Sequence, residues 1–376
     1  MNNASKQVLK NDERAMYALR ALYHDYGYAR FKVGKFEEYD LYAHNKNFLI
    51  SENILTFTDT NGKLMALKPD VTLSIIKNIG NDDISTHKVY YNENVYRTSQ
   101  GSDGFREIMQ TGLECIGNIG LYEMGEVLML AQKSLALISD DYILDLSHMG
   151  FVTGLLENAG IDTADTAKLL SLIGTKNIPA IKAYCASHAV GATVTESICA
   201  ITALYEPIEP ALERIAPMVA GDKMREAYEQ LLGVTALLRE WGDTSRVYLD
   251  FSIVNDMNYY NGIIFRGFLN GLSDGILSGG RYDSLLAKMG KRGGAIGFAV
   301  YLDLLERWGD EQPKFDVDVL LTATAETNPA NIVRAVRALR ADGNSVLVQN
   351  GTGGVRYRQL MQVDREGGAI VLEAND

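Results

Sequence analysis

Several polar residues lie at spacings that would bring their side chains together on one face of a β-sheet. In FREIMQTGLECIG, positions Gln110, Gly112 and Glu114 are two apart, so they share a face if this segment is a strand. Asp70 and Thr72 have the same spacing in LKPDVT. A carboxylate beside a hydroxyl is suited to an ammonium group, and an amide with a carboxylate suits a polar pocket floor. For any one of these residues, a solvated sheet face is at least as good an interpretation.

Basic and aromatic residues follow in neighbouring segments. Arg97 and Arg106 flank TSQGSDG, a turn-rich stretch between two predicted strands, KVYYNENVYR and FREIMQTGLECIG. Tyr259 and Tyr260 precede an Asn-Gly pair and an apolar run in NDMNYYNGIIF, a pattern of strand, turn and strand. The only charge in that segment is Asp256. This raises the question of whether the hairpin makes a ligand react or only holds one.

Other chemistry has little support. HExxH, GxSxG and GxxxxGK[ST] are absent, and the five histidines form no ligand-spaced pair, so we expect neither a metal site nor a cofactor. The GTGG at 351–354 precedes a predicted helix and could cradle a phosphate, although such loops are more often tight turns.

Composition bounds the class of protein. The chain has 376 residues, enough for two or three domains, and a net charge of −12, which argues against a broad nucleic-acid-binding surface. The N-terminus is polar, and no run of eighteen apolar residues occurs, so no signal peptide and no membrane span are expected. The three cysteines lack CxxC spacing and fit a reducing compartment. We therefore expect a cytoplasmic protein.

The elements that would position these residues belong to an α+β fold. Residues 7–27 have helical periodicity, and the signals from there to about 150 are mostly extended, including a hairpin around Asn61-Gly62. Residues 151–242 are rich in Ala and Leu and predict a helical insertion. Strands return from about 245, followed by a buried helix in AIGFAVYLDLLERWG.

A second, smaller domain is expected after a linker at 312–314. In residues 315–376, FDVDVLLTAT, NSVLVQN and AIVLEAND are predicted strands. NPANIVRAVRALRADG and VRYRQLMQVDREGG are predicted helices. Together they predict a small α/β domain beside a first domain of residues 1–312.

Five segments now carry a resemblance to the catalytic core of histidyl-tRNA synthetase, a class II aminoacyl-tRNA synthetase. In order, they are LMALKPDVT, VYRTSQGSDGFREIMQTGLECIG, NYYNGIIF, SGGRYDSLL and AIGFAVYLDLL. The resemblance covers residues 8–308 and implies the class II synthetase fold, with an antiparallel sheet. Residues 317–373 resemble the anticodon-binding domain of that family but stop after the third predicted strand, where the family continues.

Departures from the family pattern decide what the resemblance implies about activity. Asn255 and Leu304 occupy positions where the synthetases have arginines that act in adenylate formation, and Ser99 replaces an acidic residue. Arg97 matches the arginine of motif 2. A positioned arginine contributes on the order of a thousandfold in phosphoryl-transfer rate. We therefore expect the activation chemistry to be lost, with no catalytic residue, so that the hairpin holds a ligand without making it react.

The resemblance also implies a histidine-binding site. Its nine residues are Asp70, Thr72, Arg97, Arg106, Gln110, Glu114, Tyr259, Tyr260 and Tyr282. In this assignment Asp70 and Thr72 take the α-ammonium group, helped by Gln110. Arg97 or Arg106 receives the carboxylate.

The remaining residues address the ligand ring. Glu114 and Tyr260 would contact the imidazole, whose two nitrogens can donate and accept hydrogen bonds, while Tyr259 and Tyr282 form the wall. The alternative is that these residues are inherited scaffold with no occupant.

YILDLSHMG, residues 142–150, resembles the LDxGHxG stretch of the regulatory subunit of ATP phosphoribosyltransferase, a synthetase paralogue. His148 alone is more often a satisfied strand-end histidine. The resemblance implies a non-catalytic subunit of histidine biosynthesis that activates the short-form catalytic subunit and mediates feedback inhibition by L-histidine. A homodimer within a hetero-oligomer is expected, with no nucleic acid and no membrane as partner.

Two alternatives stay open. The chain could be a divergent histidyl-tRNA synthetase that uses other basic residues, such as Arg266 or Arg281. It could also be a synthetase-like sensor of a different amino acid.

Overall fold

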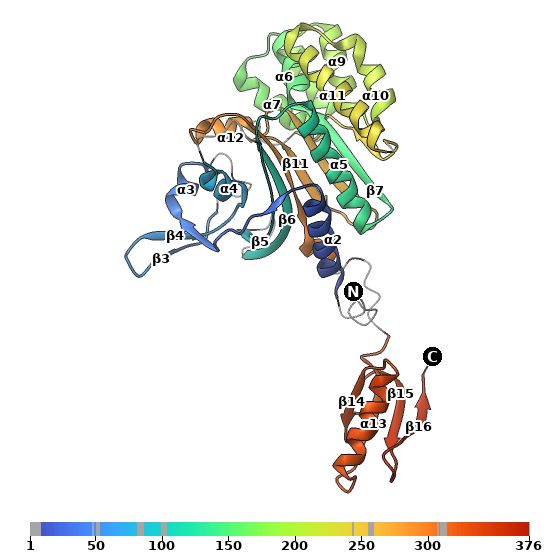
Figure 1. Cartoon of the computed structure of the whole chain (residues 1–376). Coiled ribbons are helices and arrows are strands. Elements are labelled where there is room, and N and C mark those ends of the chain that lie inside the picture. The colour runs from blue at the N-terminus through green and yellow to red at the C-terminus, as the bar shows by residue number, and fades with distance from the viewer. Residues whose placement is uncertain are drawn as a thin grey trace. The chain divides into compact units, whose positions relative to one another are not determined.

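The computed structural model describes residues 9–46, 49, 53–80, 86–98, 104–242, 244–254, 259–306, 308 and 314–375, apart from the side chains of residues 163 and 164. The chain forms two compact units (Figure 1). The larger comprises Asp12–Trp308, and the smaller comprises the described residues of Met1–Asn11 and Gly309–Asp376.

One mixed but mainly antiparallel sheet organises the larger unit. Its nine described strands have the order β1-β5-β6-β12-β11-β10-β7-β9-β8, and only the pairs β1/β5 and β7/β9 are parallel. Their bounds are β1 Ala29–Arg30, β5 His87–Thr98, β6 Phe105–Gly117, β7 Tyr142–His148, β8 Glu206–Pro207, β9 Val247–Leu249, β10 Ile263–Leu269, β11 Leu277–Arg281 and β12 Gly294–Tyr301. This is the predicted α+β architecture with an antiparallel core.

The described elements nearest the N-terminus include two helices and a second, smaller sheet. Helix α2 (Asn11–Asp25) lies within the predicted range 7–27. A three-stranded sheet has the order β2 (Phe36–Glu38), β4 (Leu64–Leu67), β3 (Thr56–Thr58), with α3 (Tyr39–Ala43) after β2. The β3–β4 turn is the predicted Asn-Gly hairpin, and Gly62 adopts the positive φ of 79° that such turns require.

Helices α3, α4 (Thr72–Asn78), α5 (Leu121–Ile138) and α12 (Asp283–Lys288) were not predicted. Helix α5 packs its buried residues into the main core of the unit and contacts β7, β10 and β12. Because it is buried almost all round, from Met124 to Leu135, its sequence lacks the one-sided period that marks an amphipathic helix. The expectation of mostly extended structure up to residue 150 was wrong here.

A run of helices separates β7 from β9. These are α6 Met149–Asn158, α7 Thr163–Gly174, α8 Ile178–Ser187, α9 Ala192–Ala203, α10 Ile208–Ile215, η2 Ala216–Met218 and α11 Gly221–Trp241. Side-chain caps define three of their starts: His148 accepts from the Gly150 amide, Asp162 from the Asp165 amide and Asn177 from the Ala180 amide. The helices gather at one end of the sheet (Figure 1).

The buried helix predicted in AIGFAVYLDLLERWG is instead β12 followed by a short 3₁₀ turn, η3 (Leu302–Leu305). Strand β12 lies between β6 and β11 and is buried on both faces, so it reads as a continuous apolar run. Periodicity alone cannot separate such a strand from a buried helix. Helix α12 (Asp283–Lys288) follows β11.

The smaller unit has a four-stranded sheet and one described helix. Strand order is β14 (Val346–Gln349), β13 (Val317–Thr322), β15 (Tyr357–Val363), β16 (Ala369–Ala374), and the helix is α13 (Pro329–Ala341). The predicted second helix is therefore wrong, since its residues form β15. Because the GTGG loop precedes a strand, the helix N-terminus that would have attracted a phosphate is missing there.

Two features of the described residues bear on function. None of the described helices combines the length and apolar character needed to cross a bilayer. Over the same residues, no group of three or more His, Cys, Asp or Glu side chains could hold a metal ion.

Candidate ligand-binding site

A cavity of about 480 Å³ opens above the middle strands of the large sheet. This volume suits a small-molecule ligand. Eight of the nine predicted histidine-site residues line it: Asp70, Thr72, Arg97, Gln110, Glu114, Tyr259, Tyr260 and Tyr282.

Glu114 lies in the cavity wall as a fully buried carboxyl. The Thr72 hydroxyl donates to its Oε1 at 2.7 Å, and the Tyr282 hydroxyl donates to its Oε2. Burial raises the pKa of Glu114 to about 8, the two hydroxyl donors oppose this shift, and the nearby Asp70 adds to it. The group is therefore poised to change protonation when a cationic or N–H-donating ligand arrives.

The Glu114 side chain needs the neighbouring residue of the sheet to be glycine. Gly297 is its cross-strand partner on β12. A Cβ built at Gly297 would collide with Glu114 Oε2 and would lie 2.5 Å from the carbonyl oxygen of Leu113. The absence of a side chain on β12 thus makes the space that the carboxyl occupies.

Asp70 and Arg97 form the next part of the wall. Asp70 precedes α4, and its Oδ1 accepts from the Leu73 amide at 2.9 Å, which satisfies a free N–H of the first helical turn. Burial raises the pKa of Asp70, while Arg97 lowers it. Arg97 Nη2 lies 3.8 Å from Asp70 Oδ2, and its Nε donates to the Pro69 carbonyl at 2.6 Å. Arg97 thus supports the loop that carries Asp70.

Gln110 contributes unused hydrogen-bonding capacity. It is only 2% exposed, and its Nε2 has no hydrogen-bond partner among the residues that the structure describes. Its cross-strand neighbour Tyr301 also lines the cavity. Buried amide nitrogens nearly always have a partner, so this group points to a ligand or an ordered water.

Three tyrosines close the site. The rings of Tyr259 and Tyr260 meet edge to face at 4.6 Å, and Tyr259 lies 5.8 Å from Tyr282. Burial raises the pKa of all three phenols well above 10, so each stays a neutral hydrogen-bonding group. Tyr282, expected only as a wall residue, is the one that hydrogen-bonds the Glu114 carboxyl.

Arg106 does not line the cavity, although its Cα lies opposite that of Arg97 in the β5–β6 ladder. Strand β12 pairs with β6 only over Gln110–Gly117. Residues 105–109 of β6 therefore extend beyond that neighbouring strand, and Arg106 is exposed. Arg97 remains as the predicted cavity arginine.

The sequence interpretation missed several lining residues, among them Tyr91, Asp274, Ser278 and Tyr301. Tyr91 could have been found, because it lies six positions before Arg97 and so on the same strand face. The others are brought to the cavity by pairing between strands distant in sequence.

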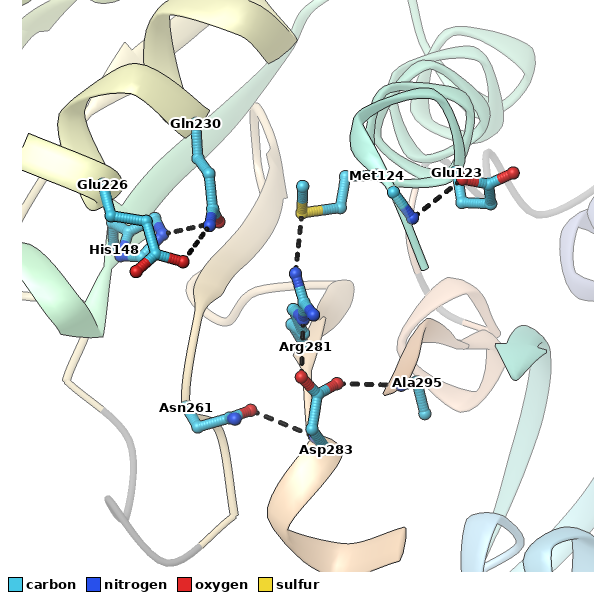
Figure 2. A network of polar contacts seen from close by, with 10 residues as sticks. Glu123, Met124, His148, Glu226, Gln230, Asn261, Arg281, Asp283 and Ala295 are labelled. Atoms are coloured by element: carbon cyan, nitrogen blue, oxygen red, sulfur yellow. Dashed lines mark hydrogen bonds and ion pairs between the residues drawn. The ribbon is translucent and has the colours of Figure 1, made fainter. Parts of the chain in front are cut away.

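The positions that depart from the synthetase pattern are only partly described. Leu304 lies in η3, packs against the main core and does not line the cavity. Asn255 and Ser99 lie outside the described residues. Of the two alternative arginines, Arg266 lines the cavity. Arg281 instead donates to Asp283 at 2.8 Å and contacts the sulfur of Met124 (Figure 2).

His148 is a satisfied strand-end histidine. Its Nδ1 accepts from the Gly150 amide at 3.1 Å and so caps α6, and its Nε2 lies 3.1 Å from Gln230 Oε1. Gln230 in turn donates to Glu226, as Figure 2 shows. Burial lowers the pKa of His148 to about 4, so the ring is neutral at physiological pH. It does not line the cavity.

Comparison with known proteins supports the family resemblance that was predicted from the sequence. The sequence model of the histidyl-tRNA synthetase family matches residues 3–305. The ATP phosphoribosyltransferase regulatory subunit of Clostridium kluyveri is 30% identical over 327 residues, which cover 84% of this chain and 83% of that protein.

Two solved structures share the fold. One is described as an ATP phosphoribosyltransferase regulatory subunit/histidyl-tRNA synthetase from Bacillus halodurans; it has a TM-score of 0.74 at 22% identity and covers 94% of this chain and 93% of that one. The other is a chain of the ATP phosphoribosyl transferase (HisG:HisZ) complex from Thermotoga maritima, with a TM-score of 0.61 at 22% identity, covering 77% and 97%.

These matches confirm the class II synthetase-like fold and the resemblance predicted from the sequence. The chain belongs to the family of ATP phosphoribosyltransferase regulatory subunits, a non-catalytic branch built on the histidyl-tRNA synthetase core.

Proposed function

We propose that this chain assembles with the short-form catalytic subunit of ATP phosphoribosyltransferase, raises its activity and makes it sensitive to feedback inhibition by histidine. The effector binds in the cavity lined by Glu114, and a homodimer forms the core of the hetero-oligomer. The ATP phosphoribosyl transferase (HisG:HisZ) complex from Thermotoga maritima contains a chain with the fold described here, which supports the assembly.

The observation that carries the histidine assignment is the combination of Glu114 and Gln110 in one cavity. A buried carboxyl held by Thr72 and Tyr282 offers an acceptor for an imidazole N–H. The Gln110 amide nitrogen, which has no partner among the described residues, offers a donor to a carboxylate, and its oxygen can accept from an ammonium group. A zwitterionic amino acid with a polar ring would use all of these groups.

The remaining groups fit the same ligand. Asp70 is a buried carboxylate for the α-ammonium, and the Thr72 hydroxyl, which donates to Glu114, still has lone pairs to accept from it. Arg97 lies beside Asp70 and also lines the cavity. It therefore supplies the cation for the ligand carboxylate.

Regulation then follows from linkage. Histidine shifts the balance between active and inhibited assemblies only if it binds the two with different affinity. The Tyr259–Tyr260 pair and the Asp70 loop surround the cavity from different parts of the chain, so closure around a ligand would change their relative arrangement.

The test is isothermal titration of the protein with L-histidine, alone and with the catalytic subunit. Saturable binding is expected, and Glu114→Ala should weaken it about tenfold to a hundredfold because an acceptor is lost inside a buried site. The matched control is Glu107→Ala on the same strand, where an exposed carboxylate contacts Asn94 and Tyr96.

Two results would overturn parts of the proposal. No saturable heat with the wild type in either setting would mean that the cavity does not hold histidine. Failure to form a complex with the short-form catalytic subunit, measured by size-exclusion chromatography with light scattering, would remove the regulatory role.

A further inference from the structure

The segment that leads into the tyrosine pair is held from outside the cavity. Asp250 follows β9 directly and begins the stretch Asp250–Val254, and only residues 255–258 separate this stretch from Tyr259 in the chain. The Asp250 amide donates to the Leu146 carbonyl at 2.8 Å, and its Oδ1 accepts from the Ser252 amide at 2.9 Å. The position of this segment therefore bears on where the cavity tyrosines can lie.

Residues at and just after the C-terminal end of helix α7 contact both ends of segment Asp250–Val254. Lys176 Nζ donates to Asp250 Oδ2 at 3.1 Å. Gly174 lies so close to Val254 that a Cβ there would be 2.7 Å from Val254 Cγ2. The helical insertion is therefore in contact with the segment that leads from β9 toward the cavity tyrosines.

Lys176 has an unusual backbone conformation for a lysine. Its φ is 51°, in the left-handed region that favours glycine, and its amide donates to the Ile173 carbonyl at 2.9 Å. A glycine would satisfy this turn with less strain. What glycine lacks is the ammonium group that reaches Asp250.

That ammonium group serves two buried carboxyls. Asp145 on β7 and Asp250 are each less than a tenth exposed, and Asp145 Oδ1 has no hydrogen-bond partner in the described part of the chain. Burial raises the pKa of Asp145 to about 7, the charge of Asp250 adds to this shift, and Lys176 opposes it. Lys176 Nζ also lies over the Tyr205 ring, 5.3 Å from its centroid.

Other polar and aromatic groups also surround this junction. Tyr205 stacks on Tyr248, with ring centroids 5.1 Å apart. Arg266 is opposite Asp145 in the β10–β7 ladder and lines the binding cavity. Lys176 forms an ion pair with Asp250, with Nζ 3.1 Å from Oδ2.

We propose that Lys176 is a positioning residue, which fixes segment Asp250–Val254 against the helical insertion and thereby holds Tyr259 and Tyr260 in the geometry that binds the ligand. This inference rests on the proposed function, because it concerns the same cavity. It assigns the helical insertion a role in tuning that site, through one ion pair and one close contact.

The test compares variants of Lys176 in the full-length protein. Lys176→Met should weaken L-histidine binding about fivefold to twentyfold, and Lys176→Arg should restore most of the affinity. Lys176→Gly separates the two roles of the residue: it should keep or raise thermal stability, because the left-handed φ suits glycine, yet bind as weakly as Lys176→Met. The control is Lys223→Met, which removes a lysine about as exposed as Lys176 whose ion-pair partner, Glu157 of α6, is exposed rather than buried.

A second measurement needs no ligand. Hydrogen–deuterium exchange should be faster in peptides covering 247–254 and 259–265 of Lys176→Met than in wild type or Lys223→Met. Unchanged histidine affinity together with unchanged exchange in Lys176→Met would overturn the inference. If the wild type binds no histidine, the proposed function fails, and the exchange comparison alone decides whether Lys176 holds the segment.

Discussion

Glu114 and His148 are two buried titratable residues on strands of the same sheet, and their surroundings differ in one respect. His148 uses both ring nitrogens on protein partners, Gly150 and Gln230. Glu114 also has two protein partners, but it faces a cavity whose wall includes the Gln110 amide nitrogen, which none of the described residues pairs with.

The difference shows how a binding site is distinguished from a structural polar contact. In both places burial shifts the pKa toward the neutral form, to about 8 for Glu114 and about 4 for His148. A shifted pKa therefore does not identify a site by itself. Unused hydrogen-bonding capacity beside an accessible volume does, because a ligand can satisfy the groups that the protein leaves open.

The largest effect should come from filling the space beneath the Glu114 carboxyl. Gly297→Ala should weaken histidine binding about a hundredfold or more, because the new methyl group collides with Glu114. For the same reason it should lower the free energy of unfolding by about 1–3 kcal/mol. Titration calorimetry and urea unfolding measure the two quantities.

The control for this variant lies beside His148. A Cβ at Gly150 would be 3.1 Å from His148 Cε1, a milder contact. Gly150→Ala should therefore leave histidine affinity unchanged. Wild-type affinity in Gly297→Ala would contradict the proposed geometry of the carboxyl.

Removing the two groups themselves should separate affinity from stability. His148→Ala should lower the free energy of unfolding by about 1–3 kcal/mol, since the Gly150 amide and Gln230 Oε1 lose their hydrogen bonds to the ring, while histidine affinity stays at the wild-type value. Glu114→Ala should instead weaken histidine binding, because the acceptor inside the cavity is lost. A His148→Ala variant that bound histidine more weakly would link the two regions and break the comparison.

The pH dependence of binding should follow Glu114. Its pKa is raised from 4.5 to about 8 in the folded chain, and an imidazole N–H requires the deprotonated carboxylate. Histidine affinity should therefore rise with pH up to about 8, by up to about tenfold per pH unit, with a proton released on binding. Glu114→Gln should lose the part of the dependence that does not come from the ligand's own titration.

The same shift predicts a trend in stability. The folded state binds the Glu114 proton more tightly than the unfolded state, so this group's contribution to stability is full below pH 4.5 and is lost as the pH rises toward 8. Thermal melts should show Glu114→Gln gaining stability over the wild type as the pH is raised through this window. An equal gain at pH 4 and pH 8 would contradict the assignment.

The smallest effect distinguishes the basic residues around the cavity. Arg106→Gln should leave histidine affinity unchanged, because Arg106 extends past the end of β12 and does not line the cavity. Arg266→Gln, which alters a lining residue, should weaken it about threefold to tenfold. Equal effects of the two substitutions would mean that only long-range charge matters.

Local patterns were sufficient where structure depends on neighbours in sequence. The β5–β6 hairpin, the Asn-Gly turn at Gly62 and helix α2 were all predicted from spacing. Where burial removes the alternation of polar and apolar residues, as in α5 and β12, the same reasoning failed. In β15, exposed and buried side chains alternate, as at Gln362 and Val363, but this segment was assigned to a helix.

By itself, the sequence determined the fold class and most of the candidate site, because ordered motifs carry both the family and the residue types that line its pocket. Only the tertiary structure separated Arg97 from Arg106, paired Tyr282 with Glu114 and revealed why residue 297 is glycine. These features depend on which strands are neighbours and where each one ends. The pairing of β6 with β12 joins residues more than a hundred positions apart, and no local pattern records it.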